Sequence, residues 1–153
     1  MYRWCRLWRK GKFGVLVVDD EPSVLMTYRL ILEKQGYAVH VAETAAKAIE
    51  LIGQYRYDLL LCDYSLEQER TGFEVIQAAR AVDPNISALL LTGYASKDTV
   101  ERAQADHISV LFKPIDIGEF FRTVNSLKKE KHAEDEQQSE KSSEQTRKNR
   151  AAN

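Results

Sequence analysis

Acidic, hydroxyl and basic side chains follow four short apolar runs of this sequence, at the points where those runs end. They are Asp19, Asp20, Asp63, Thr92 and Lys113. Carboxylates gathered in one pocket repel one another, and a hard cation such as Mg²⁺ relieves that repulsion. A lysine and a hydroxyl beside the cation would neutralise and orient a phosphate, which is most of what phosphoryl transfer requires. These residue types predict metal-assisted phosphoryl chemistry.

The side chains converge only if the apolar runs form one sheet. Short runs rich in Val, Ile or Leu alternate with longer segments of helical period, which is typical of a parallel sheet with helices on both faces. The predicted strands are Val15–Val18, Ala38–Ala42, Leu59–Cys62, Ile86–Leu91 and Ile108–Phe112. In a five-stranded sheet of order 2-1-3-4-5, the first and third strands are neighbours, and ligands bind at the carboxyl ends of the strands. We therefore predict an α/β fold with this topology.

Apolar residues recur at three- and four-residue steps between the strands, which indicates helices that cover the sheet. The predicted helical segments are 24–32, 45–52, 73–79 and 117–127, with a weaker one at 100–103. Gly36 and the pair Asp83-Pro84 are typical helix ends. The sequence thus supplies a crossover helix for each parallel strand.

Composition sets limits on the function. The 153 residues carry 22 basic and 23 acidic side chains, a formal net charge of -1, and a chain of this length forms about one domain. A balanced charge gives no general attraction to nucleic acid, and no apolar stretch is long enough to span a membrane. Cys5 and Cys62 are far apart and lie in no zinc-ligand spacing. We expect a cytoplasmic protein with no nucleic-acid partner.

Both ends of the chain differ from the part between them. Residues 1–12 mix tryptophan with arginine and lysine, and we interpret them as a disordered basic aromatic extension, with an interfacial membrane anchor as the alternative. Residues 129–153 are dominated by Lys, Glu, Gln and Ser. Such a segment buries too little surface to order itself, so we predict a frayed helix end followed by disorder. The folded domain is placed at residues 13–128.

Four motifs in combination resemble the receiver domain of bacterial response regulators. They are Val15–Pro22, Leu59–Leu66, Leu89–Gly93 and Leu111–Ile115, and the resemblance runs from about Phe13 to Leu127. It implies a flavodoxin-like fold and a place in two-component signalling or a phosphorelay. Asp63 would be the phosphoacceptor, served by a histidine kinase or a histidine phosphotransfer protein. Such a chain is a signalling phosphoacceptor rather than an enzyme, and assists only its own phosphorylation and dephosphorylation.

The resemblance also implies roles for the residues of the site. Asp20, Asp63 and the backbone carbonyl of Ser65 would bind Mg²⁺ directly, with Mn²⁺ as an alternative metal, and Asp19 would act mainly through water. Thr92 and Lys113 would contact the phosphoryl group. The Lys113-Pro114 peptide bond is expected to be cis.

The sequence departs from the family pattern at several positions. Val110 stands where the family often has an aromatic residue that moves together with the threonine, so the usual switch is in doubt. Glu67 replaces a common proline, and Gly72 comes one residue later than usual. Ser65 and Tyr94 occupy positions that tune the loss of phosphate in the family. One hypothesis is that the Tyr94 ring shields the acyl phosphate, and the alternative is a surface tyrosine without kinetic effect.

Three functions remain open at this stage. The first is a stand-alone receiver whose phosphorylation switches its binding to a separate effector protein, with a homodimer as a further option. The second is a phosphate relay or sink without an effector. The third, ranked low, is a phosphatase with an aspartyl nucleophile, because such enzymes place two aspartates one residue apart after the first strand, whereas Asp19 and Asp20 are adjacent.

Overall fold

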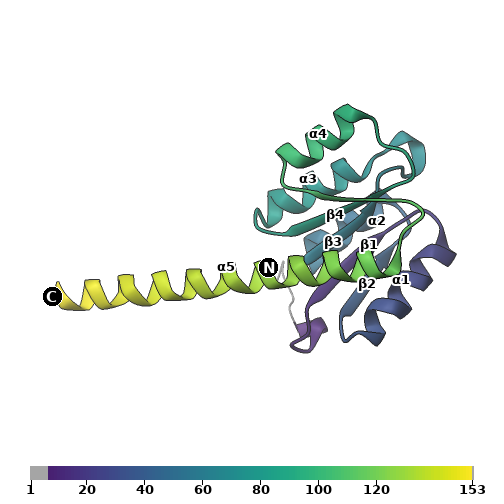
Figure 1. Cartoon of the computed structure of the whole chain (residues 1–153). Coiled ribbons are helices and arrows are strands. Elements are labelled where there is room, and N and C mark those ends of the chain that lie inside the picture. Colours follow the sequence, from purple (N-terminus) through teal and green to yellow (C-terminus); the bar gives the residue numbers. More distant parts are fainter. Residues whose placement is uncertain (1–6, 153) are drawn as a thin grey trace.

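A computed structural model of the chain describes residues 7–152 and contains one parallel sheet. Its strands lie in the order β2-β1-β3-β4-β5 (Figure 1), so the predicted topology and the flavodoxin-like fold are confirmed. Each strand lies within a residue or two of its predicted range. The strands are β1 (Gly14–Val18), β2 (Ala38–Ala42), β3 (Leu59–Asp63), β4 (Ser87–Thr92) and β5 (Ser109–Phe112).

Helices cover both faces of the sheet (Figure 1). Successive residues of a strand point to opposite faces, so alternate positions enter two separate cores. Leu16 and Val18 pack with α2 (Ala45–Gln54), α3 (Gly72–Val82) and α4 (Lys97–Ala105). Val15 and Val17 pack with α1 (Pro22–Lys34) and α5 (Ile117–Ala151). All strand residues of β1 and β3 are buried, which explains why both strands are apolar except for Asp63 at the end of β3.

Local sequence signals fix where several helices begin and end. The side chains of Thr44, Ser96 and Asp116 accept backbone hydrogen bonds at the starts of α2, α4 and α5, as N-cap residues do. Pro22 occupies the first turn of α1. The predicted stop at Gly36 follows α1 directly, where a φ of 91° favours glycine.

The segment before β1 is described from Leu7 onward, and the disorder expected for residues 1–12 stays a prediction. It forms a 3-10 helix, η1 (Leu7–Arg9). The Trp8 ring stacks on His40 with 3.8 Å between ring centroids, and Trp8 Nε1 donates a hydrogen bond to the Arg56 carbonyl. Arg9 forms an ion pair with Asp58. Trp8 therefore packs against the domain, while Trp4 and Cys5 lie outside the described residues.

The last helix also continues past the predicted domain boundary at residue 128. Lys131 is only 8% exposed, and its Nζ donates a hydrogen bond of 3.0 Å to the Asn85 carbonyl. From His132 to Ala151 the helix is exposed and protrudes from the domain (Figure 1). Extending a helix costs far less than starting one, and pairs such as Glu144 with Lys148 span single turns of it.

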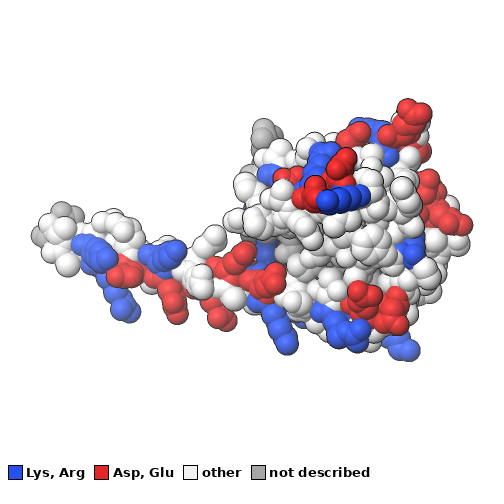
Figure 2. Space-filling view, turned by 45° about the horizontal axis from the view of Figure 1, so that its top comes forward, with Lys and Arg blue, Asp and Glu red and all other residues white. Residues whose placement is uncertain are grey.

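Charges of both signs alternate along the protruding part of α5, as Figure 2 shows. The helix therefore offers no stripe of a single sign on the face in view. Within residues 7–152, no helix has both the length and the apolar character that crossing a membrane requires.

Candidate functional site

The five residues that the sequence singled out lie at one edge of the sheet. Asp19 and Asp20 follow β1, and Asp63 is the last residue of β3. Thr92 ends β4, and Lys113 follows β5. Because all strands are parallel, their carboxyl ends meet at this edge, as predicted.

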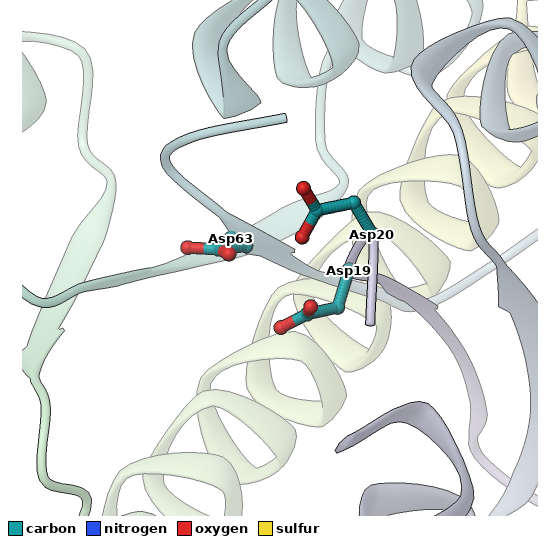
Figure 3. Close-up of side chains that lie close together, drawn as sticks. All are labelled: Asp19, Asp20 and Asp63. Carbon is teal, nitrogen blue, oxygen red and sulfur yellow. The ribbon is translucent and has the colours of Figure 1, made fainter. Parts of the chain in front are cut away.

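The acidic residues form a tight cluster at this edge. Ligand oxygens of Asp19, Asp20 and Asp63 all lie within 4.8 Å of one another. Figure 3 shows the three carboxylates projecting in the same direction from the ends of β1 and β3. Asp19 is 3% exposed and Asp63 is 8% exposed, whereas Asp20 is exposed. The cluster is thus partly desolvated and open at one side.

Lys113 is the cation that faces these acids. Its Nζ lies 3.3 Å from Asp63 Oδ2 and 3.8 Å from Asp19 Oδ2. Burial raises the pKa of the Asp63 carboxyl above its ordinary value, and Lys113 opposes that increase. Burial likewise raises the pKa of Asp19, against the hydrogen bond from the Glu21 amide, while the charge of Asp63 raises it further. A single lysine does not compensate these charges fully.

The donor set fits a hard divalent cation. Asp19 Oδ2 is buried and accepts no hydrogen bond, although most buried polar atoms have a partner. Carboxylates with an open, hydrated side suit Mg²⁺, which binds few protein oxygens and keeps several waters. The oxygens of Asp19, Asp20 and Asp63 are therefore the ones that would hold the metal.

Thr92 is buried beside the acids, with 2% of its surface exposed. Its hydroxyl donates a 2.7 Å hydrogen bond to the Tyr94 carbonyl. The backbone N–H of Lys113 donates to the Thr92 carbonyl at 2.8 Å. The threonine and the lysine are therefore tied together at the ends of β4 and β5, and the Lys113-Pro114 bond is cis, as the resemblance implied.

The loop after Asp63 is folded back on itself. Ser65 and Thr71 form a β-bridge, and the Gly72 N–H donates to the Tyr64 carbonyl at 2.8 Å. A Cβ at position 72 would lie 2.6 Å from the Asp63 carbonyl oxygen. The later glycine noted in the sequence is thus required by the close approach of α3 to the acceptor residue.

The remaining site positions lie around the cluster. Ser65 is exposed in the loop, and Tyr94 is 84% exposed. Val110 lies on β5 opposite Leu90 and is partly buried. The tuning roles of Ser65 and Tyr94 and the switch role of position 110 stay predictions.

One contact of the loop could not be found from the sequence. Glu67 was noted only as a replacement for proline, yet its Oε1 accepts a hydrogen bond from the Ala45 N–H at 2.9 Å. The two residues are 22 positions apart, and no periodic pattern connects them. Only the fold brings the loop after β3 to the start of α2.

Comparison with known proteins agrees with this geometry. Residues 15–125 match the sequence model of the response regulator receiver domain. Transcriptional regulatory protein ZraR of Klebsiella oxytoca is 32% identical over 112 residues, which are 72% of this chain and 25% of that protein. The alginate biosynthesis regulator AlgB of Pseudomonas aeruginosa is 34% identical over 101 residues, 65% of this chain and 22% of that protein. The chain thus spans about a quarter of the length of these relatives.

Solved structures show the same fold. The CheY-like receiver domain protein of Methanospirillum hungatei aligns with a TM-score of 0.76 and 26% identity, over 81% of this chain and 99% of its own. Chemotaxis protein CheY4 of Vibrio cholerae aligns with a TM-score of 0.70 and 25% identity, over 76% and 99%. The similarity in fold therefore extends over about three quarters or more of this chain.

Proposed function

The chain belongs to the family of response regulator receiver domains of two-component signalling, and from that membership we propose that Asp63 accepts a phosphoryl group from a phosphohistidine. The observation that carries the proposal is the position of Lys113 Nζ, 3.3 Å from Asp63 Oδ2 beside the acidic cluster. The donor would be a histidine kinase or a histidine phosphotransfer protein. The chain would thus be a phosphoacceptor that assists only its own phosphorylation and dephosphorylation.

The chemistry follows from the groups at the edge. A carboxylate oxygen of Asp63 forms a bond to phosphorus while the bond from phosphorus to the histidine nitrogen breaks. Mg²⁺ held by Asp20, Asp63 and the Ser65 carbonyl, and by Asp19 mainly through water, would neutralise charge on the phosphoryl oxygens. Lys113 supplies a fixed positive charge on the other side of the group. The Thr92 hydroxyl would exchange its hydrogen bond to the Tyr94 carbonyl for one to the phosphoryl group.

That exchange gives the site a means of signalling. The Thr92 hydroxyl cannot donate to both acceptors with its single proton, so phosphorylation would release the Tyr94 carbonyl at the start of the loop before α4. We propose that the altered surface binds a separate effector protein and that the chain acts in the cytoplasm. In support, Tyr94 is 84% exposed, so a change at its backbone alters a surface that a partner can reach.

A second function, relay or storage of phosphate without an effector, is favoured by Val110. A valine at the switch position has no large ring to rotate, so the site could gain and lose phosphate with little change at the surface. Reverse transfer separates the two functions. A relay returns phosphate from Asp63 to a histidine protein, and absence of any such transfer would exclude it.

Incubation with acetyl phosphate and Mg²⁺, followed by intact mass measurement, tests the central proposal. We expect wild type to gain one phosphoryl group and Asp63→Asn to gain none. Asp98→Asn is the matched control, since Asp98 is an exposed aspartate in α4, and it should gain mass like wild type. Removal of the metal with EDTA should abolish the gain. An equal gain in wild type and Asp63→Asn would refute the role of Asp63.

A further inference from the structure

Glu67 connects the loop after the phosphoacceptor to a different part of the molecule. It opens the short 3-10 helix η2 (Glu67–Glu69), and its Oε1 accepts a 2.9 Å hydrogen bond from the N–H of Ala45, the first residue of α2. The N–H groups in the first turn of a helix have no partner within the helix, and a carboxylate there is further stabilised by the helix dipole. The contact is therefore a charge-assisted one.

Backbone hydrogen bonds in the rest of the loop connect Glu67 to the residues beside the site. The Arg70 N–H donates to the Glu67 carbonyl at 3.1 Å, and the Leu66 N–H donates to the Arg70 carbonyl at 2.9 Å. The Leu66 side chain is 6% exposed and belongs to the core beneath α2 and α3. Ser65 lies directly before Leu66 and is bridged to Thr71. The position of the Ser65 backbone thus depends on where the Glu67 turn is held.

We propose that Glu67 is a positioning residue, which holds the loop so that the Ser65 carbonyl points at the metal site. This inference rests on the proposed function, because it assigns a role in binding the divalent cation of that site. Glu67 itself is not one of the three acids of the cluster, which are Asp19, Asp20 and Asp63. A proline at this position would make the loop rigid. Glu67 instead holds the loop by its hydrogen bond to the start of α2.

A competing explanation is that Glu67 acts only through its charge. A carboxylate near the acidic cluster would attract a cation whether or not it bonds to Ala45. The two explanations require different properties of the side chain. Positioning requires enough length to contact Ala45 and an acceptor oxygen, whereas simple attraction requires only a negative charge. Variants that separate reach from charge therefore distinguish them.

The test is titration of the full chain with Mg²⁺ by calorimetry. Glu67→Asp keeps the charge but is shorter by one carbon–carbon bond, about 1.5 Å, and loses the reach to Ala45. Glu67→Gln keeps the reach and the acceptor oxygen but loses the charge. Glu69→Gln removes an exposed charge two residues away in the same turn. Amide exchange at Ala45 reports directly whether the hydrogen bond is present, and thermal unfolding confirms that each variant is folded.

We expect Glu67→Asp to weaken Mg²⁺ binding by about tenfold, a typical effect of losing an outer contact that orients a metal ligand, with faster exchange at Ala45. Glu67→Gln and Glu69→Gln should bind within about twofold of wild type. The reverse order, weak binding in Glu67→Gln and normal binding in Glu67→Asp, would overturn the inference in favour of charge alone. Normal binding in all variants would also overturn it. Absence of Mg²⁺ binding in wild type, by contrast, would contradict the proposed function itself.

Discussion

Gly72 lies against the residue that the proposed chemistry modifies. A Cβ at this position would lie 2.6 Å from the Asp63 carbonyl oxygen and 2.7 Å from Leu90 Cδ1. The first contact is with backbone, which cannot rotate away as a flexible side chain can. The start of α3 can therefore approach the end of β3 only where the side chain is absent.

We predict that Gly72→Ala lowers the free energy of unfolding by about 1–3 kcal/mol, the usual range for overpacking. It should also slow phosphorylation from acetyl phosphate, because relief of the contact displaces Asp63. Urea unfolding and the rate of mass gain measure the two effects. Gly53→Ala is the control, since a Cβ there meets nothing within 4 Å, and it should be neutral or stabilising by up to about 1 kcal/mol. Equal stability of the two variants would contradict this account.

The sequence was sufficient to predict which side chains meet at this edge of the sheet, but not the contacts that support them. Asp19, Asp63 and Thr92 converge because each lies at the carboxyl end of a parallel strand, and that rule follows from strand order alone. The contact between Glu67 and Ala45 depends on the turn geometry of η2, including a φ of 55° at Gln68. A sequence pattern does not encode such a turn, so Glu67 could be seen only as a departure from the family.

At the scale of elements, the segment before β1 packs against His40 of β2 and against the residues between α2 and β3. Trp8 stacks on His40 and also contacts the rings of Tyr55 and Tyr57 edge-on. Trp8 also packs against the core that the sheet forms with α2. The aromatic cluster thus holds η1 against that face of the sheet.

We predict that Trp8→Ala lowers the free energy of unfolding by about 1–2 kcal/mol, because it removes several aromatic contacts of ordinary strength. Leu7→Ala is the matched control, since Leu7 is 86% exposed, and it should change stability little. Urea unfolding of the two variants compares them. If Trp8→Ala were as stable as Leu7→Ala, the packing of η1 would not contribute to the fold.

The two ends of the described chain hold contacts that a local sequence pattern does not reveal. Residues 7–9 are too few to show a helical period, and Trp8 packs against a residue distant in sequence, His40. The tail lacks an apolar stripe, and its helix continues from the packed half of α5 that carries Phe120 and Val124. Both features come from contacts or cooperativity outside the window in which a local pattern is read.

At the scale of the whole molecule, the aromatic cluster couples stability to pH. Burial, and to a lesser degree the charge of Arg29, lowers the pKa of His40 below its ordinary value of 6.5. The unfolded chain therefore binds more protons than the folded chain as pH falls through that value. The free energy of unfolding must then fall as the pH falls, by at most about 1.4 kcal/mol per pH unit from this single group.

We expect wild type to lose more stability than His40→Gln between pH 7.5 and about 5.5. His107→Asn is the control, because His107 is exposed and has a positive φ that asparagine tolerates. It should keep the wild-type dependence. Parallel stability curves for wild type and His40→Gln, measured by urea unfolding at each pH, would show that His40 does not contribute.

The protruding half of α5 converts a small rotation of the packed half into a larger displacement of its far end. From Lys131, where the hydrogen bond to Asn85 fixes it, the helix continues to Ala151, a rise of about 30 Å at 1.5 Å per residue. A straight helix of that length rotates about the point where it leaves the domain surface. A rotation of about 5° of the packed half would displace its far end by roughly 3 Å, so a movement too small to rearrange the core becomes a large one at a distance.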